Sequence, residues 1–109
     1  MHELAIAEEV VAIVVARTGG APVARIVIEI GRLCAVVPDA MRFCFELATE
    51  GTAAEGATLE IVEVAGEARC RACGGHVALD RPFGWCGCGS SDLEWLNGEQ
   101  LSVKEVELA

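Results

Sequence analysis

Residues 70–89 read CRACGGHVALDRPFGWCGCG and place four cysteines in two short pairs. Cys70 and Cys73 form a C-x-x-C-G-G motif, and Cys86 and Cys88 form a tighter pair after twelve intervening residues. The glycines after the first pair let the backbone turn, so that its N–H groups can point at the sulfurs. Four thiolates in two short pairs are the donor set of a closed, tetrahedral structural Zn2+ site. The segment therefore predicts a zinc site with these four cysteines as ligands.

The second pair leaves alternatives open, because zinc ribbons usually use C-x-x-C twice and here one residue separates Cys86 from Cys88. His76 is the nearest neutral donor that would replace a cysteine. A redox dithiol normally stands at a helix N-terminus, and the Gly-Gly after the first pair is a poor helix start. Cys34 and Cys44 lie alone in apolar surroundings, and we expect them to be unligated buried thiols.

The segments before the cysteines carry the periodicities of helices and strands. Apolar positions at helical spacing predict a helix over residues 4–17 that ends at Gly19, and Pro38 opens a second helix that runs to about Glu50. Apolar alternation predicts strands over 23–30 and 57–64. The side chains expected to face the core are Ile6, Val10, Ile13 and Val14, then Ala24, Ile26, Ile28 and Ile30, then Met41, Phe45 and Ala48, and finally Leu59 and Ile61.

The segment after the cysteines contains Asn97-Gly98 between apolar runs at 93–96 and 101–108, which predicts a β-hairpin. If the last strand rejoins the first sheet, the cysteine-rich segment is an insertion. We therefore predict an α+β fold, with a small mixed sheet, two helices and an inserted zinc-ribbon subdomain. Residues 1–65 and 99–109 would form the α/β domain, and residues 66–98 the zinc-binding subdomain.

The composition of the 109 residues excludes several classes of protein. The net charge of −9 argues against a nucleic-acid binder, whose affinity rests on Lys and Arg. No apolar stretch reaches the roughly 20 residues of a membrane span, and the start lacks the features of a secretion signal, so we expect a cytoplasmic protein without membrane contact. No nucleophile–base pair or phosphate-binding glycine loop is visible, so no catalytic residues and no enzyme are expected.

The first three residues, Met1, His2 and Glu3, form a second candidate metal site. The α-amine, the His2 imidazole and the backbone amide between them can form fused chelate rings around one ion. Nitrogen donors in a plane suit Ni(II) or Cu(II), and Glu3 adds an amide or a carboxylate. Because any chain that begins Met-His carries this pattern, a disordered tip without a metal is the competing interpretation.

The two candidate sites occur together in a sequence that resembles the HypA/HybF family of hydrogenase-maturation nickel metallochaperones. The resemblance begins with the MHE start and the apolar helix after it and covers essentially the whole chain in order. The matching stretches are IVIEIGRL at 26–33, VVPDAMRFCFELATEGTAAEGATLEI at 36–61, the cysteine segment, and CGSSDLEWLNGEQLSVKEVEL at 88–108.

The resemblance implies a small accessory protein that is not an enzyme. It would bind Ni2+ as a transient cargo through Met1, His2 and Glu3, and cooperate with an accessory GTPase to supply the large subunit of [NiFe]-hydrogenase. The motif positions would make Cys70, Cys73, Cys86 and Cys88 the ligands of a structural Zn2+.

Two points remain open at the level of sequence. The family's second C-x-x-C would begin at residue 85, where this chain has Trp85, so the position of Cys86 departs from the pattern. A monomer and a homodimer are both compatible with the sequence. The alternative function is a zinc-ribbon protein-interaction module without a nickel role.

Overall fold

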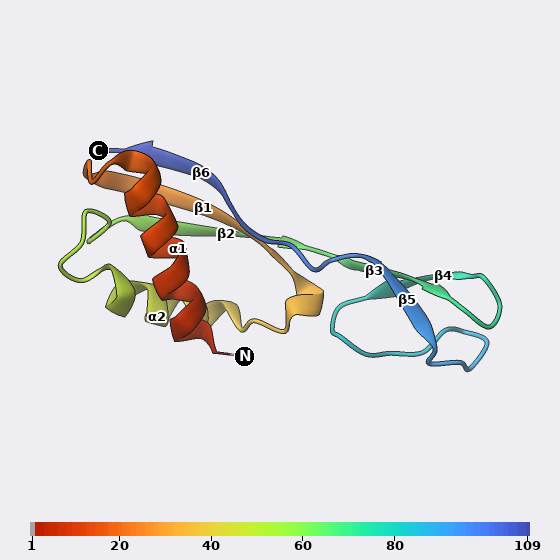
Figure 1. Ribbon diagram of the computed structural model, residues 1–109. Coiled ribbons are helices and arrows are strands. Elements are labelled where there is room, and N and C mark those ends of the chain that lie inside the picture. Colours follow the sequence, from red (N-terminus) through yellow and green to blue (C-terminus); the bar gives the residue numbers. More distant parts are fainter. Residues whose placement is uncertain (1) are drawn as a thin grey trace. The chain divides into compact units, whose positions relative to one another are not determined.

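The computed structural model describes residues 2–109, and Figure 1 shows their course. The elements are α1 (Glu3–Thr18), β1 (Val23–Gly31), the 3-10 turn η1 (Arg32–Cys34), α2 (Pro38–Thr49), β2 (Thr58–Val64), β3 (Gly66–Cys70), β4 (His76–Leu79), β5 (Leu93–Asn97) and β6 (Leu101–Leu108). The sheet order is β2-β1-β6 in one three-stranded sheet and β4-β3-β5 in the other. The predicted α+β class with two helices is confirmed.

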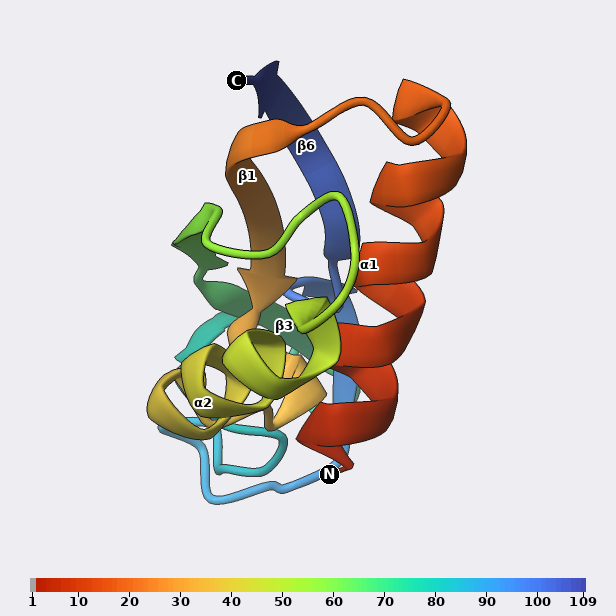
Figure 2. The same cartoon turned by 90° about the vertical axis from the view of Figure 1, so that its left-hand side faces the viewer.

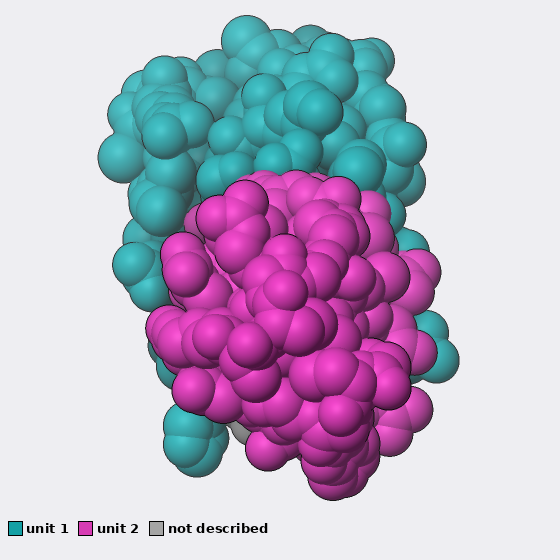
Figure 3. All heavy atoms as spheres, turned by 90° about the vertical axis from the view of Figure 1, so that its right-hand side faces the viewer, with its two compact units in different colours: residues 1–29, 36–62, 102–109 teal, residues 30–35, 63–101 magenta. Residues whose placement is uncertain are grey.

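The described residues divide into two compact units, which Figure 3 colours separately. Unit 1 takes the chain up to Glu29, then Val36–Val62 and Ser102–Ala109, and contains both α-helices. Unit 2 takes Ile30–Ala35 and Glu63–Leu101, and contains the sheet β4-β3-β5. Among these residues, no helix is long and apolar enough to span a membrane.

In unit 1, α1 and α2 lie on one side of the sheet (Figure 2). Helix α1 ends at Gly19, whose φ of 64° is the left-handed conformation that glycine adopts without strain. Val10 and Val14 are buried as predicted, whereas Ile13 is 37% exposed and that part of the prediction is wrong. Most sides of α1 are apolar, so the spacing of its apolar residues does not fix which side faces the core.

The central strand β1 is buried more completely than the alternation of apolar and polar residues along it predicts. Ile26 and Ile28 are fully buried, as expected, and Val27 on the opposite face is also only 4% exposed. Arg25, on the same face as Val27, forms ion pairs with Glu60 and Glu107 from the neighbouring strands. Side chains of β2 and β6 flank β1 on both sides, so the short Val27 side chain is covered by longer cross-strand neighbours even on this face.

The predicted Asn97-Gly98 hairpin is wrong. β5 pairs antiparallel with β3, whereas β6 joins the other sheet beside β1. Gly98 instead allows two backbone segments to approach each other closely. Gly98 has a φ of 110°, and its carbonyl accepts a hydrogen bond of 2.9 Å from the Leu33 N–H. The last strand does rejoin the first sheet, as the insertion hypothesis required.

Gly31→Ala should lower the free energy of unfolding of unit 2 by about 1–3 kcal/mol, the usual cost of overpacking, or by more. A Cβ at residue 31 would lie 1.8 Å from the carbonyl oxygen of Gly98, which is backbone and cannot move aside cheaply. Denaturant unfolding at fixed zinc measures the change. Gly87→Ala is the matched control, because a Cβ there meets nothing within 4 Å. Equal stability of the two variants would contradict the packing argument.

Candidate metal centre

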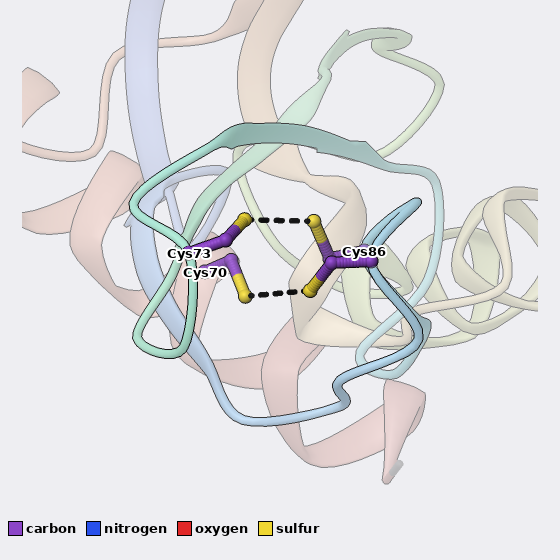
Figure 4. A group of neighbouring side chains, drawn as sticks. Cys70, Cys73 and Cys86 are labelled. Atoms are coloured by element: carbon purple, nitrogen blue, oxygen red, sulfur yellow. Dashed lines mark hydrogen bonds between the residues drawn. The ribbon is translucent and has the colours of Figure 1, made fainter.

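The four cysteines of the predicted zinc site converge on one point in unit 2. All four sulfurs lie within 4.8 Å of one another. The Cys70 and Cys88 sulfurs are 3.6 Å apart, and the Cys73 and Cys86 sulfurs are 3.5 Å apart (Figure 4). Both residues of the tighter second pair therefore belong to the cluster, despite their one-residue departure from C-x-x-C.

The first pair is placed by the end of β3 and the turn that follows it. The Cys70 N–H donates to the Gly75 carbonyl at 2.8 Å, and the Gly74 N–H donates to the Cys70 carbonyl at the same distance. Gly74 adopts a φ of 77°, which lets the chain reverse within the motif. The Gly75 N–H then points at the Cys73 sulfur, 3.4 Å away, as the glycine pattern predicted.

The second pair is held by a turn of its own. The Cys86 N–H donates to the Ser90 carbonyl at 2.8 Å, and the Gly89 N–H donates to the Cys86 carbonyl at 2.9 Å. The two turns are joined by Arg71, whose backbone N–H donates to the Asp92 carbonyl at 2.9 Å and whose guanidinium pairs with the Asp92 carboxylate at 3.0 Å. Hydrogen bonds to backbone therefore bring the two pairs face to face.

The electrostatics of the cluster call for a cation. The backbone N–H of Cys73 donates to the Cys70 sulfur and lowers the pKa of Cys70 to about 6, against the opposing effect of burial. The Gly75 N–H acts in the same direction on Cys73, but hydrogen bonds with the Cys86, Cys88 and Cys70 sulfurs outweigh it and raise the pKa of Cys73 to about 11. The neighbouring sulfurs therefore disfavour the thiolate form of Cys73. A bound divalent cation would favour that form, and four converging thiolates with N–H donors fit a structural zinc ion.

The alternative ligand His76 does not take part in this group, which consists of the four cysteines. His76 begins β4 and pairs across the strands with Arg69. Cys34 and Cys44 were expected to be buried, and that prediction is wrong, since both are partly exposed. The Cys34 thiol donates to the carbonyls of Glu99 and Gln100 at 3.3 and 3.4 Å, and burial raises its pKa.

The candidate nickel residues stand at the start of α1 in unit 1. Met1 lies outside the described residues. His2 is exposed at the N-cap position, where its carbonyl accepts the first helical hydrogen bond from the Ile6 N–H at 3.2 Å. Its imidazole makes no capping hydrogen bond, so the side chain is available to an ion.

Glu3 has a role that the sequence did not reveal. Its carboxylate accepts a hydrogen bond of 3.1 Å from the N–H of Val37, the residue that precedes α2. This bond lowers the pKa of Glu3, with smaller help from the backbone of Glu3 itself. The carboxylate therefore links the start of α1 to the start of α2. Residues 3 and 37 are far apart in the sequence, so only the folded chain brings them together.

Comparison with known proteins shows similarity to one family over the whole length of the chain. The family profile described as "Hydrogenase/urease nickel incorporation, metallochaperone, hypA" matches residues 1–108. The hydrogenase maturation factor HypA of Nostoc punctiforme is 54% identical over 108 residues, covering 99% of this chain and 96% of that protein. The hydrogenase maturation factor HypA of Geotalea uraniireducens is 43% identical over 109 residues, covering 99% of both chains.

The fold is also that of a solved structure. The solution structure of the Ni metallochaperone HypA from Helicobacter pylori superposes with a TM-score of 0.65 at 23% identity, covering 99% of this chain and 97% of that one. With the four-cysteine cluster and the exposed His2 in place, these matches confirm the resemblance. The chain belongs to the HypA family of nickel metallochaperones for hydrogenase maturation.

Proposed function

We propose that this protein carries Ni(II) at its N-terminus and hands it on for insertion into [NiFe]-hydrogenase, without catalysing a reaction of its own. The observation that carries the proposal is the exposed imidazole of His2 at the first turn of α1, in a chain that matches the nickel family from residue 1 to residue 108. A carrier has to release its cargo, so its site should be exposed and incompletely saturated. An imidazole at a helix start, with solvent around it, meets that requirement.

The nickel donors in this proposal are His2, the α-amine of Met1 and Glu3. The Glu3 carboxylate already accepts the Val37 N–H, so it binds the ion only by giving up that bond. The backbone amide of Glu3 takes no part in this bond to Val37. Glu3 therefore has two uses, as a nitrogen donor to the ion and as a carboxylate that fixes the N-terminal segment beside α2.

The zinc ion in this proposal is structural and is held by Cys70, Cys73, Cys86 and Cys88. Support comes from the sulfur geometry and from the N–H groups that face two of the sulfurs. Zinc supplies cross-linking and charge neutralisation there. The division into an α/β nickel domain (residues 1–65 and 99–109) and a zinc subdomain (66–98) stays a prediction.

The partners in this proposal are an accessory GTPase of nickel insertion and the hydrogenase large subunit, met in the cytoplasm. The net charge of −9 suits basic partner surfaces, and it disfavours nucleic acid. A better donor set on the receiving protein would draw the ion away by ligand exchange.

Nickel affinity should fall as the pH is lowered from about 8 to about 6. The imidazole and the α-amine bind nickel only when deprotonated, so protons compete with the ion for these nitrogens. Calorimetric titration of zinc-loaded protein with a native start measures the affinity. A protein that binds no nickel even at pH 8 would instead be the zinc-ribbon interaction module.

A further inference from the structure

Helix α2 carries two apolar rows, and the core of unit 1 takes up only one of them. Met41 and Phe45, four positions apart, are buried. Phe43 and Leu47 have the same spacing, which places them side by side on the helix, and they are 63% and 46% exposed. A helix at a protein surface normally turns a polar side to solvent. The exposed row therefore contributes nothing to the core and marks a surface for interaction.

A groove between α1 and α2 extends this row. Its volume of about 560 Å3 is within the range of binding clefts. The side chains that line it are mainly small and apolar, and include Val11, Ala12, Val15, Ala48 and Ala53. Ala48 directly follows Leu47, so the row and the groove adjoin along α2, within unit 1. We call the row and the groove together the helical face.

Carboxylates border the exposed row on α2. Asp39 and Glu46 lie four and three positions from Phe43, and both are exposed. Glu50 is also exposed and lies three positions from Leu47. In the part of unit 1 that the structure describes, none of these three carboxylates forms an ion pair. Their negative charge therefore lies directly beside the apolar row and is not neutralised by the protein.

The acidic charge of the chain is concentrated in the same unit. Unit 1 holds eleven acidic and four basic residues, which gives it −7 of the total of −9. Glu8 is the charged side chain that lines the groove. The basic residue of α2, Arg42, is engaged, because its guanidinium donates to the Leu59 carbonyl at 2.9 Å. The complement of the helical face is thus a surface that combines apolar side chains with Lys or Arg.

We propose that the helical face binds a basic amphipathic helix of a partner protein. Such a helix places apolar side chains every three or four residues over the row and the groove, and its cationic side chains reach the carboxylates. A β-strand would find no partner here, because the backbone groups of α1 and α2 bond within their own helices. A second copy of this chain would bring like charges together, and so would an anionic membrane. This recognition goes beyond the proposed nickel delivery and uses none of its metal donors.

A synthetic peptide tests the helical face with a defined ligand. The probe has about 18 residues, or ~5 helical turns, with leucines at helical spacing along one side and lysines on both flanks. Two control peptides change one property each. The first reorders the same residues so that the leucines no longer share a side, and the second replaces lysine by glutamate. Anisotropy of the labelled peptide measures binding to the zinc-loaded full chain. We expect saturable binding of the probe alone, weakened by salt.

Variants locate the binding site on α2. Phe43→Ala should weaken binding of the probe about tenfold or more, and Leu47→Ala should act in the same direction, because each removes an apolar anchor. Phe83→Ala is the matched control, since this ring is 64% exposed but belongs to unit 2, and its loss should leave the affinity unchanged. Circular dichroism should show full helix content in all three variants, because the substituted side chains are exposed.

A charge variant tests the carboxylates separately. Glu46→Gln should weaken binding of the probe at low salt and make binding less dependent on salt, because it removes a charge and keeps the size of the side chain. Glu94→Gln is the matched control, since Glu94 is an exposed glutamate of β5 in unit 2. That variant should bind the probe as the parent chain does.

Several outcomes would overturn the proposal. Equal binding of the probe and the reordered peptide would do so, as would parental affinity in both Phe43→Ala and Leu47→Ala. Equal binding of the glutamate peptide would contradict the role of the carboxylates. Self-association of the free chain that Phe43→Ala abolishes would make a second copy of this chain the occupant. The peptide experiment involves no nickel, so its failure is distinguishable from a failure of the nickel titration.

Discussion

Removal of zinc should unfold unit 2 while leaving the helices of unit 1 folded. The buried hydrophobic cluster of unit 2 is small, with Leu33, Ala68 and Leu79 at its centre and Val77 and Leu93 packed against it. Such a core cannot by itself offset the loss of chain entropy. Structural zinc contributes about 10–16 kcal/mol in small zinc domains near neutral pH, which exceeds the stability of most whole proteins.

Amide hydrogen exchange measures this effect residue by residue. After chelation, we expect protection to be lost over β3, β4 and β5 and to remain in the buried turns of α1 and α2. Cys86→Ser should behave like the chelated protein, whereas Cys44→Ser should keep its zinc, because Cys44 lies in α2 outside the cluster. Persistent protection of β3 without metal would mean that the ion is not structural. Full zinc in Cys86→Ser would mean that another donor, such as His76, replaces the cysteine.

Substitution of His2 by alanine should lower nickel affinity about a hundredfold or more. Even an outer partner of a metal ligand is typically worth 10–100-fold in affinity, and in the proposed site a ligand itself and its chelate ring would be lost. The fold should not change, because the His2 side chain is exposed and makes no capping hydrogen bond. Calorimetric nickel titration at about pH 8 measures the loss, and circular dichroism checks that α1 is retained.

His76→Ala is the matched control for this experiment. The sequence has two histidines, and His76 is also exposed but stands in the other unit, at the start of β4. Nickel affinity should be unchanged in that variant. In cells that lack their own HypA-family protein, the nickel content of the hydrogenase large subunit should rise with the parent chain and with His76→Ala, but not with His2→Ala. Normal nickel binding by His2→Ala would place the cargo site elsewhere.

Local sequence patterns were sufficient for much of the fold and for the cysteine cluster. Both helices end or begin where Gly19 and Pro38 indicate, because these residues act through their own backbone conformation. Each pair of cysteines is short, so the turns that aim its sulfurs are encoded within a few residues of them. The two pairs then meet through the hydrogen bonds between Arg71 and Asp92, which are 21 positions apart. The MHE start and the order of the matching stretches were also sufficient to indicate the family, which the comparisons confirm.

The tertiary structure decided whatever depends on contacts between distant segments. The buried side of α1 follows from the elements packed against it, which is why Ile13 is exposed although its spacing matches the core. Gly98 serves a close approach to Gly31, some sixty-seven positions away, and not the hairpin that its neighbour Asn97 suggests. The bond from Val37 to Glu3 arises in the same way. Sequence by itself determined the local turns and the family and indicated the candidate metal donors, because turn residues and short motifs act within a few positions of one another. Only the folded chain decided which faces are buried and which surfaces are offered to partners, because these depend on packing between segments whose pairing no local pattern encodes.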